Sequence, residues 1–489
     1  MRTSRLSGLV LLPIYTLGIV LLSLAFPEFG FKSFAFVMFA GVILTIAVIP
    51  LKWSIVFTFS YIGLEGFLKV VSNYNPIIHV GSDILVIFLC LKAAIQAFTR
   101  RESMPIEVPP LIFLFLLHFG WVIVTIFNPY GLGLVPSLAG AKLYVTMVFL
   151  FFFGFYQTKS MKDAHHYMIP FLAVTLLHTG FGIYQGLVGE QSVLSLHPRY
   201  AVQLAKYGTT AFRPFGLTNL PGGPAVYMAL VFPFILYFIF TVRSKLIKWI
   251  LLSYIPAGIF LFLLCQVRSS FLKGIIGSLI FTLGAFIYLA RDSRKLAAIL
   301  VTATIGIAGG VYFLPQIMAM SIEENASNED AIDRSLTVFD IDQISRSRHG
   351  SLDRIVKYSS EAPFGAGFSR IGAAAGAFED AHRADPFFGA NHFFADNFWV
   401  AVLAEEGIPG VIIFSLILFF LLFKVWRSIF QCDDMHRKLL CWAIFGSMAG
   451  VMMGLYGAEG ILYNPDSCFF WFFSGLALKI PHLAPYGKS

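Results

Sequence analysis

Residues 397–423 read NFWVAVLAEEGIPGVIIFSLILFFLLF, and Glu405 and Glu406 are the only charged residues in this stretch. A helix of about 20 such residues is long enough to cross the hydrocarbon core of a bilayer. The whole chain has the same character: of its 489 residues 57% are hydrophobic and 13% are charged, and the mean hydropathy is +0.78. These values lie far outside the range of soluble domains and indicate an integral membrane protein.

Similar apolar runs recur along the chain. Roughly 280 apolar residues, at about 20 per span, supply on the order of 14 spans. The runs cover 7–25, 33–50, 53–72, 80–98, 110–127, 140–156, 166–187, 223–241, 249–266, 270–289, 297–315, 397–423, 437–456 and 466–480. The runs 53–72, which contains Glu65 and Lys69, and 466–480 are weak and can be re-entrant. We therefore predict an all-α polytopic membrane protein with about 12–14 transmembrane helices.

The positive charges predict the orientation, because short cytoplasmic loops carry an excess of Lys and Arg. In alternate connections the sequence places Lys52, Arg100, Arg101, Lys159, Lys162, Arg243, Lys245, Lys248, Arg291, Arg294, Lys295, Lys424, Arg427, Arg437 and Lys438. The run 7–25 follows Arg2 and Arg5 and has no small-residue cleavage site after it, so we expect a retained first helix. Both termini are then expected in the cytoplasm.

Two long connections fall on the exterior side, near 188–222 and at 316–396. The second resembles a small soluble subdomain. We therefore expect an N-terminal transmembrane bundle at 1–315 with about eleven spans, a loop subdomain at 316–396 and C-terminal transmembrane helices at 397–489.

The net charge of +8 follows from this topology and does not indicate a nucleic-acid partner. The five cysteines, Cys90, Cys265, Cys432, Cys441 and Cys468, show no paired spacing. We expect neither a disulfide nor a zinc site.

Two arginines on the exterior side are candidates for chemistry. Arg213 lies in TTAFRPFGLTNLPGGPAVYMA (209–229), and Arg268 lies in the tight turn CQVRSSFLKG (265–274) with Lys273 about one helical turn further on. An arginine at the mouth of a bundle is costly unless it is paired or faces water, and its fork can grip a phosphate. As structural alternatives, both arginines can snorkel to lipid headgroups. Arg199 is a further candidate in the same exterior loop.

The third candidate stretch ends the second exterior loop and begins the run at 397. Asp396 precedes it at the outer edge of the membrane, where its carboxylate can act as a base or simply cap the helix. His392 can be a second candidate or can satisfy a local hydrogen bond. The nearby Asn397 and Trp399, and the upstream Arg354, Arg370 and Arg383, are candidate substrate contacts. The aromatic residues here suit stacking on sugars and an interfacial belt equally well.

The order of four motifs along the chain resembles that of a known family. RPFGLTNLPGGPAVYMA (213–229), VRSSFLKG (267–274), EAPFGAGFSRIG (361–372) and DNFWVAVLAEEGIPG (396–410) resemble the O-antigen ligase and Wzy-type polysaccharide polymerase superfamily. The resemblance implies a GT-C-like fold in a bacterial inner membrane, an active site facing the periplasm, and no metal or other cofactor. It also implies a polyprenyl-diphosphate-linked glycan as donor, a glycan acceptor, membrane lipids and a chain-length regulator as candidate partners. The family's phosphate-binding arginines map onto Arg213 and Arg268.

One departure separates the branches of this superfamily. The ligase pattern begins its last motif with His followed by Asn, but alignment through Glu406 and GIPG (407–410) puts Asp396 in the His position and leaves His392 four residues too early. The Asp-Asn start resembles the polymerase members. We therefore expect a polymerase in which Asp396, Arg213 and Arg268 are catalytic, with a ligase as the nearest alternative.

A transporter of lipid-linked sugars is an alternative of another class. Such transporters are expected to carry charges within their spans and to show two related halves, whereas this chain has no convincing internal repeat. A membrane scaffold without activity would leave Arg213 and Arg268 unexplained.

Overall fold

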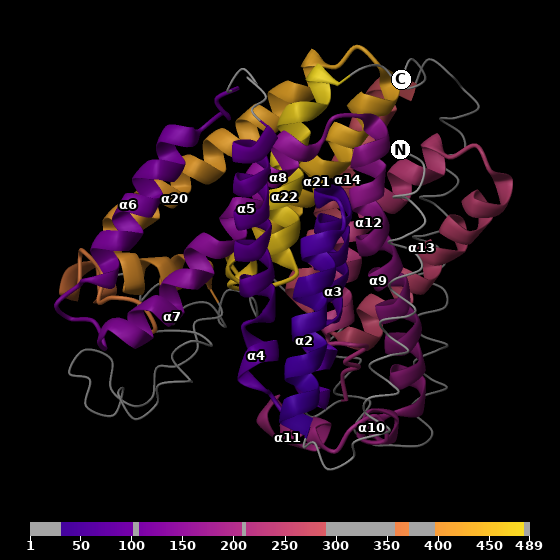
Figure 1. Ribbon diagram of the computed structural model, residues 1–489. Coiled ribbons are helices and arrows are strands. Elements are labelled where there is room, and N and C mark those ends of the chain that lie inside the picture. The colour runs from indigo at the N-terminus through magenta and orange to yellow at the C-terminus, as the bar shows by residue number, and fades with distance from the viewer. Residues whose placement is uncertain (1–30, 101–106, 208–211, 290–356, 371–396, 484–489) are drawn as a thin grey trace.

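The computed structural model describes residues 31–100, 107–207, 212–289, 357–370 and 397–483. Within these ranges the secondary structure is helical and no strand occurs. Helices cross the molecule side by side, and Figure 1 shows α6 and α20 inclined to the others at one side of the bundle.

The helices have the following bounds: α2 (Phe31–Val48), α3 (Leu51–Val71), α4 (Pro76–His79), α5 (Gly81–Arg100), α6 (Ile112–Ile126), α7 (Leu134–Val145), η1 (Thr146–Val148), α8 (Phe149–Gln157), α9 (Met161–Val188), α10 (Glu190–Leu194), α11 (Arg199–Tyr207), α12 (Gly223–Thr241), α13 (Lys245–Cys265), α14 (Arg268–Leu289), α20 (Phe398–Gln431), α21 (Met435–Gly454), η3 (Gly460–Leu462), α22 (Asp466–Lys479) and η4 (Ile480–His482).

The prediction of an all-α polytopic membrane protein is confirmed. Eight helical stretches in the described ranges are long and apolar enough to cross a membrane, and two shorter apolar helices, Phe39–Val48 and Ile112–Ile126, accompany them. Every predicted run in the described ranges coincides with helix, while the runs 7–25 and 297–315 lie outside those ranges. The weak run at 53–72 is α3, one of the eight. The total number of spans stays a prediction.

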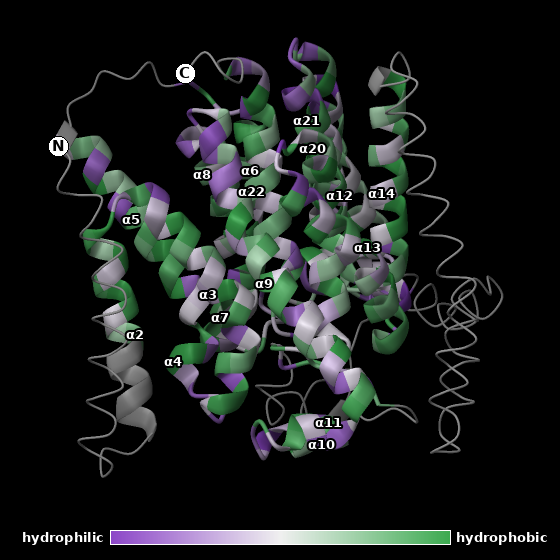
Figure 2. Cartoon of the chain, turned by 90° about the vertical axis from the view of Figure 1, so that its right-hand side faces the viewer, coloured by the Kyte–Doolittle hydropathy of each residue, from purple (hydrophilic) through white to green (hydrophobic). Residues whose placement is uncertain are grey.

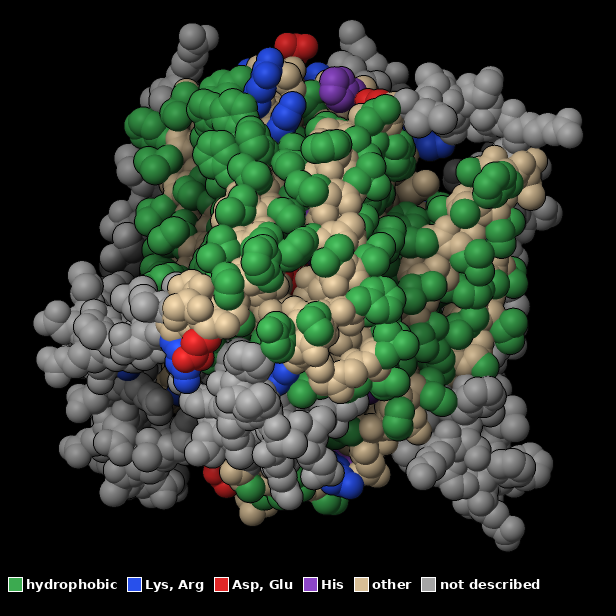
Figure 3. All heavy atoms as spheres, turned by 90° about the vertical axis from the view of Figure 1, so that its left-hand side faces the viewer, with side chains coloured by type: hydrophobic (Ala, Val, Ile, Leu, Met, Phe, Trp, Pro, Cys, Tyr) green, Lys and Arg blue, Asp and Glu red, His purple; other side chains and the backbone are tan. Residues whose placement is uncertain are grey.

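The two ends of the bundle differ. At one end, which we call the basic end, Lys52 at the start of α3 pairs with Asp163 at the start of α9, and Lys479 at the end of α22 pairs with Glu107. The other end, which we call the loop end, carries α4, α10 and α11 (Figures 1 and 2). Between the ends, Figure 3 shows a flank covered mostly by hydrophobic side chains, as expected of a surface that faces lipid.

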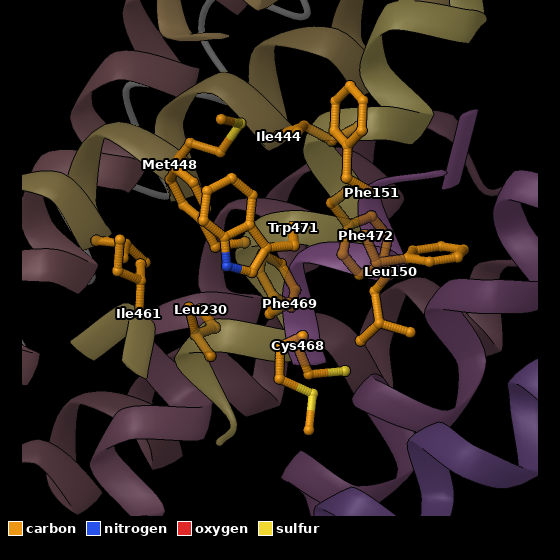
Figure 4. Close-up of a cluster of buried hydrophobic side chains, with 14 of the residues drawn as sticks. Leu150, Phe151, Leu230, Ile444, Met448, Ile461, Cys468, Phe469, Trp471 and Phe472 are labelled. Carbon is orange, nitrogen blue, oxygen red and sulfur yellow. The ribbon is translucent and has the colours of Figure 1, made fainter. Parts of the chain in front are cut away.

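The core is built around α22. This helix has 14 residues and is buried from Ser467 to Leu478, so protein surrounds it where lipid would otherwise lie. Figure 4 shows its Phe469, Trp471 and Phe472 among side chains from α8, α12 and α21. Protein contacts on every side explain why the run 466–480 looked weak as a span, because a helix that does not face lipid needs neither full length nor uniform hydropathy.

Glycines allow the central helices to approach closely. A Cβ added to Gly154 of α8 would lie 2.0 Å from the carbonyl oxygen of Phe472, and one added to Gly475 of α22 would lie 2.0 Å from that of Phe151. Gly446 of α21 meets Gly277 of α14 in the same way, at 2.4 Å from its carbonyl oxygen. Because lipid tails are as apolar as side chains, such backbone-to-backbone packing is a main source of helix association in membranes.

We predict that Gly475→Ala destabilises the protein, because the added methyl group overlaps the backbone of α8. The expected cost is about 1–3 kcal/mol, measured as a lower melting temperature in detergent. Gly180→Ala is the matched control, since a Cβ there meets no atom within 4 Å. Equal melting temperatures for the two variants would contradict the packing described here.

Candidate functional site

The loop before α12, residues 212–222, carries Arg213 and is called the arginine loop. Its backbone is left-handed at Gly216 (φ +57°) and at Gly222 (φ +77°), a conformation that glycine adopts without strain. Gln185 of α9 fixes the middle of the loop. Its Oε1 accepts from the backbone N–H of Phe215 at 2.9 Å and of Gly216 at 2.6 Å, and its Nε2 donates to Gly216 O at 3.0 Å.

His178, two turns earlier in α9, makes a second fixed contact. Its Nδ1 accepts from the backbone N–H of Leu217 at 3.1 Å, and its Nε2 lies 2.9 Å from the carbonyl oxygen of Gly63. Because Nδ1 accepts, the proton of the neutral ring resides on Nε2. The hydroxyl of Tyr200 in α11 donates to Thr218 O at 3.0 Å. Side chains from α9 and α11 thus hold the arginine loop in one conformation.

The arginine loop packs against the turn that precedes α14. The backbone N–H of Gly222 donates to Pro214 O at 2.8 Å and closes the loop. A Cβ on Gly222 would lie 2.3 Å from Cγ2 of Val267 and 3.1 Å from the carbonyl oxygen of Cys265. Only a glycine permits this approach.

This contact brings the segments that carry Arg213 and Arg268 together. Arg213 lies close enough to Cys265 to act electrostatically on its thiol, and Arg268 begins α14 three residues after Cys265. Both arginines are half-buried. The segments that carry the two arginines therefore touch at the loop end, and we call this contact the cationic corner. Guanidinium groups suit a phosphate or diphosphate.

Lys273 lies five residues into α14, on the side of this corner that faces the basic end. It forms an ion pair with Asp466 at the start of α22, and both side chains are buried. Gly454 of α21 lies against the Lys273 side chain, where a Cβ would be 2.1 Å from Cε. Loss of one partner would leave a buried charge uncompensated, so the structure gives Lys273 a pairing role. Its predicted contact with substrate stays a prediction.

A second buried carboxylate lies nearby on α3. Glu65 accepts from Ser82 Oγ at 3.1 Å and from Asn464 Nδ2 at 3.2 Å, and Lys69 pairs with it at 3.0 Å. Asn464 lies two residues before Asp466, so the segment before α22 links Glu65 to the Lys273 pair. In the part of the chain that the structure describes, three buried oxygens here have no hydrogen-bond partner: Asp466 Oδ1, Asn464 Oδ1 and Ser467 Oγ.

Helix α20 is broken at Gly407, whose φ of 70° and ψ of −167° are not helical. In Figure 1 the longer part of α20 runs beside α6 from the region near α7 toward the basic end. The break frees backbone groups, and residues 357–370, called the docked segment, bind them. Ala366 N donates to Ala404 O at 2.8 Å, and Ile408 N donates to Pro363 O at 2.8 Å. The docked segment therefore replaces the helical bonds that the break removes.

Glu405 ties the docked segment to the bundle. Its Oε2 accepts from the Tyr144 hydroxyl at 2.7 Å, and its Oε1 accepts from the backbone N–H of Arg370 at 3.0 Å. The Arg370 guanidinium donates to Ala366 O at 3.1 Å and to the carbonyl oxygen of Tyr130. Burial lowers the pKa of Arg370 to about 10, an effect that the charge of Glu405 opposes, so this arginine stays protonated at neutral pH.

The beginning of α20 is capped by Asn397. Its Oδ1 accepts from Trp399 N at 2.9 Å and from Val400 N at 3.3 Å, and its Nδ2 donates to Tyr456 O at 3.2 Å. The helix is therefore capped without Asp396. Residue 397 is also anchored beside the end of α21, whose Gly454 touches Lys273 of α14.

The remaining predicted residues divide into two groups. Asp396, His392, Arg354 and Arg383 lie outside the described residues. Arg199 is exposed at the loop end, where its Nε donates to Asn73 Oδ1 at 2.9 Å, and Trp399 is half-buried.

Several residues that shape this region were not among the candidates predicted from the sequence. Gln185 and His178 lie in an apolar helix and carry no motif signal. Asp466 and Tyr144 gain their roles only from partners far away in the chain. A polar or charged residue inside an apolar run was the available signal, because such residues are expensive in membranes unless they are paired.

No protein-family model and no curated protein matches the chain. Among the described residues, no group of three or more His, Cys, Asp or Glu side chains is placed to hold a metal ion.

We predict that Gln185→Ala loosens the arginine loop. The variant leaves two N–H groups and one carbonyl buried without partners, at about 1–3 kcal/mol for each group. Amide hydrogen exchange of residues 212–222 should accelerate and the melting temperature should fall. Gln191→Ala, at an exposed position of α10, should change neither. Unchanged exchange in the Gln185 variant would show that the loop does not depend on this side chain.

Proposed function

We propose that the chain is a metal-independent glycosyltransferase that polymerises polyprenyl-diphosphate-linked oligosaccharides into a surface polysaccharide. The proposed location is a bacterial inner membrane, with the loop end facing the periplasm. The observation that carries the proposal is the contact between the arginine loop and the turn before α14. It joins the segments of Arg213 and Arg268, the two residues that the family resemblance assigns to phosphate binding.

The proposed chemistry needs charge stabilisation and a base. When the glycan leaves its lipid diphosphate, negative charge develops on the departing oxygen, and Arg213 and Arg268 stabilise it from fixed positions. The acceptor hydroxyl loses its proton to Asp396 as the new glycosidic bond forms. Anchoring of the adjacent Asn397 to the end of α21 supports this role, because it ties the start of α20 to α14 through Gly454 and Lys273.

The unpartnered oxygens at the start of α22 favour a hydroxyl-rich ligand. Asp466 Oδ1, Asn464 Oδ1 and Ser467 Oγ are buried and can each accept a hydrogen bond from a sugar hydroxyl. Burial of such atoms without a partner is costly, so a ligand or water that binds them is stabilised. Their position next to the Lys273–Asp466 pair puts them on the same side of the bundle as the cationic corner.

One observation favours the transporter alternative. Glu65, Lys273, Asp466 and Glu405 are charged residues buried inside helices, and transporters place such residues along their substrate path. Each of these four, however, lies within seven residues of a helix terminus at the loop end. The buried Lys92 and Arg437 lie toward the basic end, where each donates to backbone carbonyl oxygens. The cluster of four at the loop end suits a one-sided enzyme better than a path through the bundle.

Purified protein in proteoliposomes distinguishes these functions. A polymerase converts a polyprenyl-diphosphate-linked oligosaccharide alone into a ladder of longer chains. A ligase forms product only when lipid A core is added, and a transporter moves the substrate without forming a new bond. A ladder supports the proposal, whereas translocation without bond formation would refute it.

We predict that Arg213→Lys and Arg268→Lys each lower the rate of ladder formation roughly 10- to 100-fold, since each loses charge-assisted hydrogen bonds worth about 1.5–3 kcal/mol. Lysine keeps the charge but not the two-pronged geometry. Membrane insertion should be unaffected. Arg243→Lys, in the connection after α12 at the basic end, is the control and should retain full activity. A wild-type rate in both site variants would remove the proposed phosphate contact.

Asp396→Asn should abolish polymerisation, with a loss of roughly 100-fold or more, while expression and melting temperature stay normal. Asn397 already caps α20, so this variant removes the charge without removing the cap. Asp433→Asn, an exposed acid at the basic end, should be silent. Full-length polymer from the Asp396 variant would exclude it as the base, and His392 would then be the next residue to replace.

A further inference from the structure

Two cysteines meet at the basic end, far from the candidate site. Cys432 follows the last residue of α20, and Cys441 lies in the second turn of α21. Their sulfur atoms are 3.9 Å apart and both thiols are buried and free. Their separation of nine residues is not a recognised pairing motif, so this contact was not evident from the sequence. Cys90, Cys265 and Cys468 have no comparable thiol contact in the part of the chain that the structure describes.

The surroundings of Cys432 favour a reactive thiol. A hydrogen bond with Cys441 lowers the pKa of the Cys432 thiol, and the charges of Arg437 and Lys438 act in the same direction, while burial and Asp433 oppose them. Cys432 is itself buried, but the neighbouring Gln431 and Asp433 are exposed, so the connection that carries the thiol lies at the surface. Low thiol pKa and access to small oxidants are the conditions under which cysteines are oxidised.

We propose that Cys432 and Cys441 form an oxidation site at which a hydroperoxide converts the two thiols into an intramolecular disulfide. Cys432 lies in the non-helical connection between α20 and α21, so it has freedom to approach Cys441 by the about 2 Å that bond formation needs. The inference does not depend on the proposed glycosyltransferase activity.

The chemistry balances in two steps. The Cys432 thiolate attacks one oxygen of hydrogen peroxide, the O–O bond breaks, and the departing hydroxide takes a proton to become water. Cys432 is then a sulfenic acid. The sulfur of Cys441 attacks the Cys432 sulfur, the S–S bond forms, and the S–O bond breaks to release a second water. Two thiols are oxidised by two electrons in total and one peroxide is reduced to two waters.

The position of Cys441 determines the product. A thiol in contact with Cys432 captures the sulfenic acid before further peroxide can convert it to the irreversible sulfinic form. The disulfide would fasten the end of α20 to α21 across the connection 432–434, and reduction by thiols would release it.

The test uses the purified full-length protein, treated with increasing hydrogen peroxide, then unfolded, alkylated and mapped by mass spectrometry. Cys432 and Cys441 should lose their free thiols together and appear as one linked peptide that dithiothreitol separates. Cys90, Cys265 and Cys468 should remain alkylated. In Cys441→Ala the linked peptide should vanish, and dimedone should trap a sulfenic acid on Cys432.

Two outcomes would overturn the proposal. Both thiols could stay fully alkylated at peroxide concentrations that oxidise glutathione in the same tube, or both could reach sulfinic acid without a linked peptide. The wild-type measurement decides between these results and the expected one even when the Cys441 variant fails to fold.

Discussion

A backbone that leaves regular helix inside an apolar bundle must find hydrogen-bond partners, because neither lipid nor a hydrophobic core supplies them. Two parts of this protein are shaped by that constraint. The docked segment forms hydrogen bonds with the backbone groups that the break at Gly407 frees, for example from Ile408 N to Pro363 O. In the arginine loop, the side chain of Gln185 alone forms hydrogen bonds with three backbone groups.

The same constraint fixes the backbone of the candidate site. Side chains that form hydrogen bonds with the backbone of a loop also fix the positions of its Cα atoms. The Cα atom of Arg213 therefore lies in a loop whose backbone is held by Gln185 and His178. The start of α14 is equally constrained, since Lys273 is paired with Asp466 and its backbone meets Gly450 of α21. A site that stabilises a developing negative charge benefits from such fixed positions, because no reorganisation is needed during the reaction.

Much of the architecture was predictable from hydropathy, since the run at 223–241 and α12 have the same bounds. The short α22 was harder to predict because protein rather than lipid surrounds it. In the candidate site, Arg213 and Arg268 could be predicted from the sequence, because an arginine near the membrane is costly unless it is paired or faces water. The roles of Gln185 and His178 were not, because hydrogen-bond partners distant in sequence depend on helix placement. The cap of α20 was also ambiguous in the sequence. Asp396 and Asn397 are both residue types that cap helices well, and only the backbone geometry identifies Asn397 as the cap.

The central claim is that the arginine loop and the start of α14 together form a diphosphate site. Its most direct test is photo-crosslinking with a polyprenyl-diphosphate-linked oligosaccharide that carries a diazirine on the first sugar, followed by peptide mapping. Crosslinks are expected in both 212–222 and 265–273, and they should disappear when unlabelled lipid-linked substrate competes. Crosslinks confined to lipid-facing surfaces of the bundle, and insensitive to competitor, would contradict it.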